Sequence, residues 1–169
     1  MPARPLLDTL LDALLDSAVD NEYCIIHLPA RTLATTETFV SQAEVADQIP
    51  ILMDKMYSWV KSSGVMPVGK NIVIYDQAKN DGMRVRVGFS VSESFSNSEP
   101  ITCTEFEAAT AAHVRHVGPY SFLPSVHTGL NSWCIDLSLQ RCDLSWEEYS
   151  DWDDNESKLV TDVYLKILD

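Results

Sequence analysis

The chain has 169 residues, of which 46% are apolar and 22% are charged, and this fits one globular domain while excluding pervasive disorder. It holds no apolar run of about 18 residues, which excludes a helical membrane span. Its 12 basic residues face 25 acidic ones, so the net charge of −13 argues against direct binding of nucleic acid, which needs lysines and arginines at the phosphates.

Residues 1–20 have leucines at helical spacing, with aspartates on the opposite side at Asp8, Asp12, Asp16 and Asp20. The pattern predicts an amphipathic helix of about four turns that covers the domain's core or pairs with a second subunit in a homodimer. Its acidic polar face does not favour a membrane surface. Because a secretory signal needs an uncharged apolar run after a basic start, we expect a cytoplasmic protein.

A first structural unit is predicted over residues 21–91. A strand over 23–28 precedes a polar, threonine-rich stretch, and a helix follows with Asp47 as N-cap, Pro50 in its first turn and Gly64 at its end. Two strands, 71–75 and 83–91, are then joined by the turn Asn80-Asp81-Gly82. Residues 92–100, rich in Ser, Glu and Asn, are predicted to be a linker.

The second unit, 101–169, repeats this order. A strand-like run over 101–117 leads to a helix that begins near Ser121, with Pro124 in its first turn. A strand over 146–149, an acidic loop over 151–156 and a last strand over 159–167 complete it.

The two units match at a constant offset of 74 residues, which pairs Pro50 with Pro124, Trp59 with Trp133, and Tyr75 with Tyr149. Helix start, helix core and strands all stay in register. We therefore predict an α+β fold of duplicated βαββ units with pseudo-two-fold symmetry. Antiparallel sheets would carry helices on one side and a concave ligand groove on the other.

Alternation along the last strand predicts which side chains face the groove. Leu159, Thr161, Val163, Leu165 and Ile167 would point to the helices, and Val160, Asp162, Tyr164 and Lys166 to the groove. A partly buried Asp162 needs a partner. That partner is either a cationic ligand or an internal arginine, for which Arg84 and Arg86 are the candidates on the equivalent strand.

Aromatic residues on strands and loops are predicted to border the groove, where they suit flat or cationic molecules: Tyr75, Tyr120, Trp146, Tyr149, Trp152 and Tyr164. Trp59 and Trp133 lie on apolar helix faces and are interpreted as core residues. His116 is interpreted as a side chain that pins the turn at Gly118-Pro119.

No cofactor or metal is predicted. The sequence contains no Gly-rich phosphate loop, nucleophile elbow or zinc motif. The four cysteines, at positions 24, 103, 134 and 142, show no Cys-x-x-Cys spacing, and we expect buried thiols. His113 and His116 lack further metal ligands at a useful spacing.

Four segments together resemble the GyrI-like effector-binding domains. They are the turn His116-x-Gly118-Pro119-Tyr120, the helix carrying Trp133, the strand Trp146-Glu147-Glu148-Tyr149 and the strand Thr161-Asp162-Val163-Tyr164. The resemblance covers roughly residues 23–168. Such domains are the ligand-binding halves of many AraC- and MerR-type transcription regulators of bacteria and also occur as free-standing proteins.

The resemblance implies a duplicated βαββ fold that recognises hydrophobic, often cationic, compounds, as in multidrug recognition. Asp162 matches the position of a glutamate that faces cationic ligands in that family, with a side chain one methylene shorter. The predicted ligand-binding residues are Asp162, Tyr164, Trp146, Tyr149, Tyr120, Tyr75, Glu148 and Arg86.

Fewer than about 25 residues precede the first predicted strand, too few for a helix-turn-helix domain, so we expect a stand-alone sensor or sequestering protein. Two alternatives stay open. One, which the resemblance implies because some free-standing relatives resemble such enzymes, is a hydrolase that opens strained rings of electrophilic compounds, with Asp162 or Glu148 as base. The other is an acidic protein that binds a larger protein partner, as free-standing relatives that inhibit DNA gyrase do.

Overall fold

A computed structural model describes residues 22–77 and 82–169 of the chain. The predicted helix over 1–20 and most of the turn at 80–82 lie outside the described residues. No helix in the described ranges is both long enough and apolar enough to cross a membrane.

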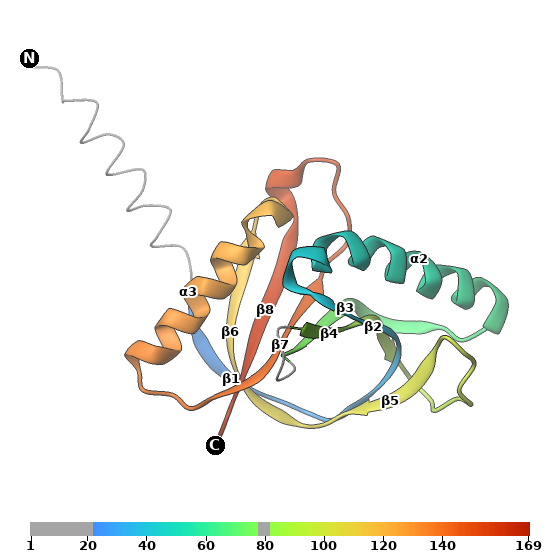
Figure 1. The fold of residues 1–169 in the computed structure, drawn as a ribbon, viewed down its shortest axis with the longest axis horizontal. Helices are drawn as coiled ribbons and strands as arrows, with labels where there is room; N and C mark the ends of the chain where they lie inside the picture. The colour runs from blue at the N-terminus through green and yellow to red at the C-terminus, as the bar shows by residue number, and fades with distance from the viewer. Residues whose placement is uncertain (1–21, 78–81) are drawn as a thin grey trace, which may run out of the picture.

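Residues 22–77 and 82–169 form one eight-stranded antiparallel sheet with two helices, α2 (Val45–Ser63) and α3 (Leu123–Asp136) (Figure 1). The strands lie in the order β1-β6-β8-β7-β3-β4-β2-β5. Their bounds are β1 Cys24–Leu28, β2 Arg31–Ser41, β3 Pro67–Gln77, β4 Gly82–Val91, β5 Thr102–Phe106, β6 Ala109–Val117, β7 Arg141–Tyr149 and β8 Val160–Ile167.

The sheet order confirms the duplicated α+β fold. The sheet has β7 and β3 at its centre, and each strand of one half has its counterpart at the same distance on the other side. The outermost strands are exchanged, because β1 pairs with β6 of the second half and β5 pairs with β2 of the first. Each βαββ unit therefore starts with β2 or β6, and β1 and β5 join the halves. Sequence periodicity contains no information on that exchange.

The threonine-rich stretch after Pro29, for which no strand was predicted, forms the long strand β2. Thr35 and Thr36 are buried there, and β-branched threonine fits a pleated, half-buried surface. The predicted single strand over 101–117 is likewise two strands, β5 and β6.

Helix α2 begins at Val45, so Asp47 lies in its first turn and is not the N-cap, and Pro50 lies inside the helix. A short 3-10 turn, Gln42–Glu44, leads directly into it, which explains the earlier start. The end was predicted correctly, because Gly64 terminates α2 with a φ of 72°, a left-handed conformation that glycine adopts without strain. Pro124 lies in the first turn of α3, as predicted.

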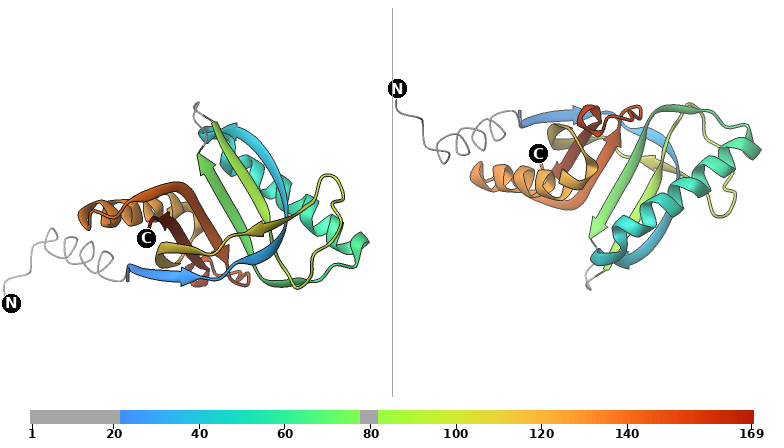
Figure 2. Two further views of the ribbon diagram at one scale, coloured as in Figure 1. Left: turned by 90° about the horizontal axis from the view of Figure 1, so that it is seen from below. Right: turned by 90° about the horizontal axis from the view of Figure 1, so that it is seen from above.

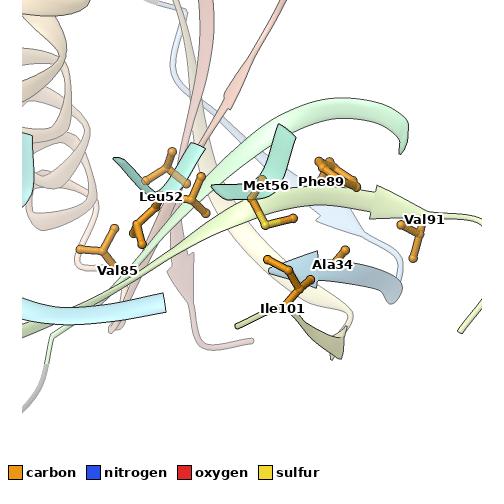
Figure 3. Close-up of a cluster of buried hydrophobic side chains, with 9 residues drawn as sticks. Ala34, Leu52, Met56, Val85, Phe89, Val91 and Ile101 are labelled. Atoms are coloured by element: carbon orange, nitrogen blue, oxygen red, sulfur yellow. The ribbon is translucent and has the colours of Figure 1, made fainter. Parts of the chain in front are cut away.

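Both helices pack on the same face of the sheet, on different halves. Helix α2 lies over β2 and β4, and α3 over β6 and β8, with the two helices well apart in Figure 2. The α2 core (Figure 3) consists of Ala34, Leu52, Met56, Val73, Val85, Val87, Phe89, Val91 and Ile101. The α3 core consists of Ala112, Val114, Leu123, Val126, Leu130, Cys134, Val163 and Ile167. Trp59 and Trp133 pack against these cores, as interpreted from sequence.

The opposite face, called the reverse face below, carries a third core. It consists of Leu33, Ile72, Ile74, Phe106, Ala111, Trp146 and Tyr164. The strands of the two halves run in clearly different directions in Figure 1, and this twist brings β1 and β5 around the reverse face. The sheet therefore buries side chains on both faces.

Candidate functional site

A pocket of about 1170 Å³ lies between α2 and α3 on the helix-bearing face. Its α2 wall is largely apolar, with Val45, Ile49 and Met53. The α3 wall includes Leu123 and His127. The floor and mouth are formed by Tyr75, Glu147, Tyr149, Tyr120 and Trp152. A mostly apolar concavity with a few convergent polar groups is the usual form of a small-molecule site.

The pocket exists because neither helix covers the two central strands. Since α2 packs on β2 and β4, and α3 on β6 and β8, the side chains of β3 and β7 on this face meet the open space between the helices. One row of directly paired residues crosses the sheet there: Val87, Val73, Glu147, Val163 and Val114. A single carboxylate therefore stands among four valines.

Glu147 also lies on the pseudo-two-fold axis. It is directly paired with Val73, which is its own counterpart at the 74-residue offset. Tyr75 and Tyr149, another pair at that offset, flank this position symmetrically. The second repeat thus has an acid where the first has an apolar residue, at the pair of positions that lies on the pseudo-two-fold axis.

The Glu147 carboxylate is 3% exposed and is held by three donors. The Tyr75 hydroxyl donates to Oε2 at 2.8 Å, and the Tyr149 hydroxyl donates to the same oxygen. Nε2 of His127 lies 2.7 Å from Oε1 and is the donor, because the carboxylate can only accept. A buried carboxylate needs such partners to offset the loss of water.

Burial raises the pKa of both Tyr75 and Tyr149 well above its usual value, and the negative charge of Glu147 raises it further. Both phenols therefore stay neutral and contribute hydrogen bonds without charge. Among the described residues, His127 alone forms an ion pair with Glu147, and only when its imidazole is protonated. With a neutral imidazole, the carboxylate on the pocket floor has no ion-pair partner among the described residues.

Aromatic rings form a continuous edge of the pocket. Tyr120 meets Tyr149 edge-on at 5.2 Å between ring centroids and lies 6.2 Å from Trp152. Tyr75 meets the His127 ring edge-on at 5.8 Å. Ring faces beside a carboxylate attract flat and cationic organic groups.

The structure brings together three of the eight predicted ligand-binding residues, Tyr75, Tyr120 and Tyr149, in the lining of this pocket. The other five, Asp162, Tyr164, Trp146, Glu148 and Arg86, are not in that lining. Their strand neighbours place them on the reverse face. Alternation sorted the last strand correctly, since Val163 and Ile167 pack under α3. The groove was predicted on the sheet face opposite the helices. This pocket instead lies on the helix-bearing face, and α2 and α3 form its walls.

Asp162 is engaged inside the protein. It is 2% exposed, and its oxygens accept hydrogen bonds from His113 Nε2 at 2.8 Å, Arg115 Nε at 3.0 Å and Lys70 Nζ at 2.9 Å. The internal arginine partner is thus Arg115, whereas Arg84 and Arg86 both pair with Asp76. Burial alone would raise the pKa of Asp162, but the hydrogen bonds from these three donors hold it well below the usual range.

The remaining predicted residues have structural partners on the reverse face. Trp146 and Tyr164 stack on each other at 5.0 Å with an interplanar angle of 10°. Glu148 pairs with Arg31. His116 Nε2 lies 3.0 Å from the Pro119 carbonyl oxygen, which matches its interpretation as a side chain that pins the turn.

Sequence reasoning missed Glu147 and His127. Alternation could have found Glu147, because Trp146 and Glu148 share one face of β7 while Glu147 and Tyr149 share the other. A site that contains Tyr149 should therefore contain Glu147. The repeat could have pointed to His127, because its counterpart at the 74-residue offset is Met53, which lines the pocket as well.

The chain belongs to the family described as GyrI-like small molecule binding domain, which it matches over residues 21–168. No curated protein matches it significantly. Among solved structures it is similar to the EcmrR C-terminal domain, with a TM-score of 0.73 and 18% identity over 88% of this chain and 98% of that one. In a cryo-EM structure of an EcmrR–DNA complex, it spans 63% of the EcmrR chain and 95% of its own length.

Two further solved structures share the fold. SAV2435, solved with tetraphenylphosphonium bound, has a TM-score of 0.67 and 11% identity over 87% of this chain and 94% of that one. A hydrolase from Listeria innocua has a TM-score of 0.57 and 11% identity over 94% of this chain and 98% of that one. At these identities the likeness concerns the fold.

Proposed function

We propose that the pocket between α2 and α3 binds a hydrophobic organic cation, with Glu147 as its charge partner, and that the protein senses or sequesters that cation. The observation that carries this is a carboxylate 3% exposed on the pocket floor, held by two neutral phenols and the His127 imidazole. Membership of a small-molecule binding family supports it. So does the similar fold of SAV2435, which was solved with a lipophilic cation.

The energetics favour a cation over a neutral ligand of the same size. The apolar walls favour burial of aromatic groups at about 25 cal/mol per Å². The carboxylate has already lost its water on folding, so a ligand cation gains attraction without a further loss of carboxylate hydration. Tyr120, Tyr149 and Trp152 provide ring faces for the cation or its substituents.

Two adjacent residues provide a matched test. Glu147 and Glu148 carry the same side chain on neighbouring positions of β7, one on the pocket floor and the other paired with Arg31 on the reverse face. Tetraphenylphosphonium would be titrated by calorimetry into the wild type, Glu147→Gln and Glu148→Gln. We expect Glu147→Gln to weaken binding by about 2 kcal/mol, roughly 30-fold in Kd, and Glu148→Gln to change it less than about threefold.

Equal losses in both variants would contradict the assignment of the charge partner. A saturable wild-type affinity for neutral triphenylphosphine oxide equal to that for tetraphenylphosphonium would contradict the preference for cations. Circular dichroism and thermal unfolding of each variant would show whether a loss of binding reflects a loss of fold.

The hydrolase alternative is not supported at the residues first considered for it. Glu148 and Asp162 are both absent from the lining of the pocket, and the lowered pKa of Asp162 opposes work as a general base near neutral pH. Binding to a larger protein partner stays a prediction from the net charge.

A further inference from the structure

Cys24 lies beside a histidine that is bonded to a carboxylate. The thiol is exposed on β1, at the edge of the sheet, which corrects the expectation of a buried cysteine at this position. Its Sγ is 3.5 Å from His113 Nδ1, and His113 Nε2 is 2.8 Å from Asp162 Oδ1. Three neighbouring strands, β1, β6 and β8, thus bring a thiol, an imidazole and a carboxylate into one chain of contacts.

Strand register explains why the three groups meet. Cys24 is directly paired with His113, and His113 is directly paired with Tyr164 on the next strand. Direct partners in an antiparallel pair present their side chains on the same face. The His113 ring lies 4.9 Å from the Tyr164 ring, which is itself stacked on Trp146. This aromatic row holds the imidazole with one nitrogen toward the thiol and the other toward the carboxylate.

We propose that Cys24 is a nucleophile activated by His113 and Asp162, and that it is a site of covalent modification by small soft electrophiles. The site is separate from the pocket, because Cys24 and His113 lie on the reverse face. It does not depend on the function proposed for the pocket.

The hydrogen bonds define the direction of proton transfer. Asp162 is charged and can only accept, so His113 Nε2 carries a proton, and in the neutral ring Nδ1 then presents a lone pair to the thiol. The thiol proton moves from Sγ to Nδ1 and leaves a thiolate, which is the reactive form of cysteine. The carboxylate of Asp162 stabilises the imidazolium that results.

The atoms balance for two kinds of electrophile. With an alkyl halide, the sulfur–carbon bond forms as the carbon–halogen bond breaks, halide leaves and the proton stays on His113. With an α,β-unsaturated carbonyl compound, sulfur adds to the β-carbon and His113 returns its proton to the α-carbon. Neither step needs an oxidant, a reductant or a metal.

Other charged groups around the imidazole act on both members of the pair. Arg115 and Lys70 both bond Asp162, and their positive charges favour the thiolate and oppose the imidazolium, which the Asp162 carboxylate stabilises. Burial raises the pKa of Tyr164 far above its usual value, with the charges of Glu148 and Asp162 adding to the effect, so its ring stays neutral. Asp162 remains ionised throughout the neutral range because its pKa is lowered.

The experiment is the pH dependence of alkylation by iodoacetamide, followed by mass spectrometry of the peptide that contains Cys24. Near pH 6 an ordinary thiol of pKa about 8.5 is less than about 1% ionised. A larger thiolate fraction raises the alkylation rate, but a more acidic thiol forms a less nucleophilic thiolate, which offsets part of that increase. We therefore expect wild-type Cys24 to react about tenfold faster than Cys24 in His113→Gln near pH 6.

Glutamine at position 113 can still donate to Asp162 but cannot take a proton from sulfur. The matched control is His27→Gln, which removes the histidine of β1 itself, bonded to Thr110, and should leave the rate unchanged. The wild-type profile is a second test that needs no variant. A wild-type rate that falls about tenfold per pH unit below pH 8, as for a free thiol, would overturn the proposal, as would equal rates in wild type and His113→Gln.

Discussion

Protonation of His127 should compete with a cationic ligand for Glu147. Nε2 of His127 lies 2.7 Å from the Glu147 carboxylate, and the two groups form an ion pair when the imidazole is protonated. Once charged, His127 becomes an internal cation that occupies the position a ligand cation would use. The affinity for a cation is therefore expected to be higher when the imidazole is neutral, and binding to the protonated protein should release the imidazole proton.

The size of the effect follows from the geometry. Two unit charges about 4 Å apart interact by roughly 4 kcal/mol at an effective dielectric constant of about 20. The His127 side chain is 27% exposed, so solvent screens part of this interaction. We expect about 2 kcal/mol, roughly a 30-fold weaker Kd for tetraphenylphosphonium at pH 5.5 than at pH 8.

The assay is isothermal titration at both pH values, in buffers of different ionisation enthalpy so that the released proton is counted. In His127→Gln the neutral amide still donates to Glu147, and the Kd should vary less than about threefold over the same range. A pH dependence that persists in His127→Gln would refute the reasoning, as would a wild-type Kd that is constant between the two pH values. The other titratable groups near the carboxylate, Tyr75 and Tyr149, stay neutral throughout because their pKa is raised.

Three further predictions concern stability, each measured by chemical denaturation. Gly88→Ala should destabilise the fold by about 3 kcal/mol or more, because the added Cβ would lie 1.8 Å from the Ala34 carbonyl oxygen. Gly82→Ala should destabilise it less, because there the added Cβ would clash only with the side chain of Phe39. Because the pKa of Asp162 is lowered, its stabilising contribution is present above about pH 4 and is lost as the pH falls, and Asp162→Asn should reduce that acid dependence. Because the pKa of Tyr75 is raised, stability should fall above about pH 10, less so in Tyr75→Phe.

Local signals in the sequence were enough to predict the internal repeat and the helix in each of its two units. The end of α2 at Gly64 and the position of Pro124 follow from backbone preferences that act within a few residues. The 74-residue offset identified the duplication, and Tyr75 and Tyr149 indeed lie in symmetric positions on the pocket floor. These features depend on local backbone conformation and on periodicity, and both can be predicted from the sequence without knowledge of tertiary contacts.

The sites themselves depend on contacts between distant parts of the chain. Alternation sorts a strand into two faces, but which face carries the pocket depends on where the helices pack, and the two helices leave β3 and β7 uncovered. Asp162 was predicted to bind a ligand, but tertiary contacts place Lys70, His113 and Arg115 beside it as hydrogen-bond donors. Cys24 and His113, 89 residues apart, meet because β1 is exchanged into the other half of the sheet. The sequence by itself determined the two described helices, most of the strands and their symmetry, whereas strand pairing and helix packing decided which side chains share a site.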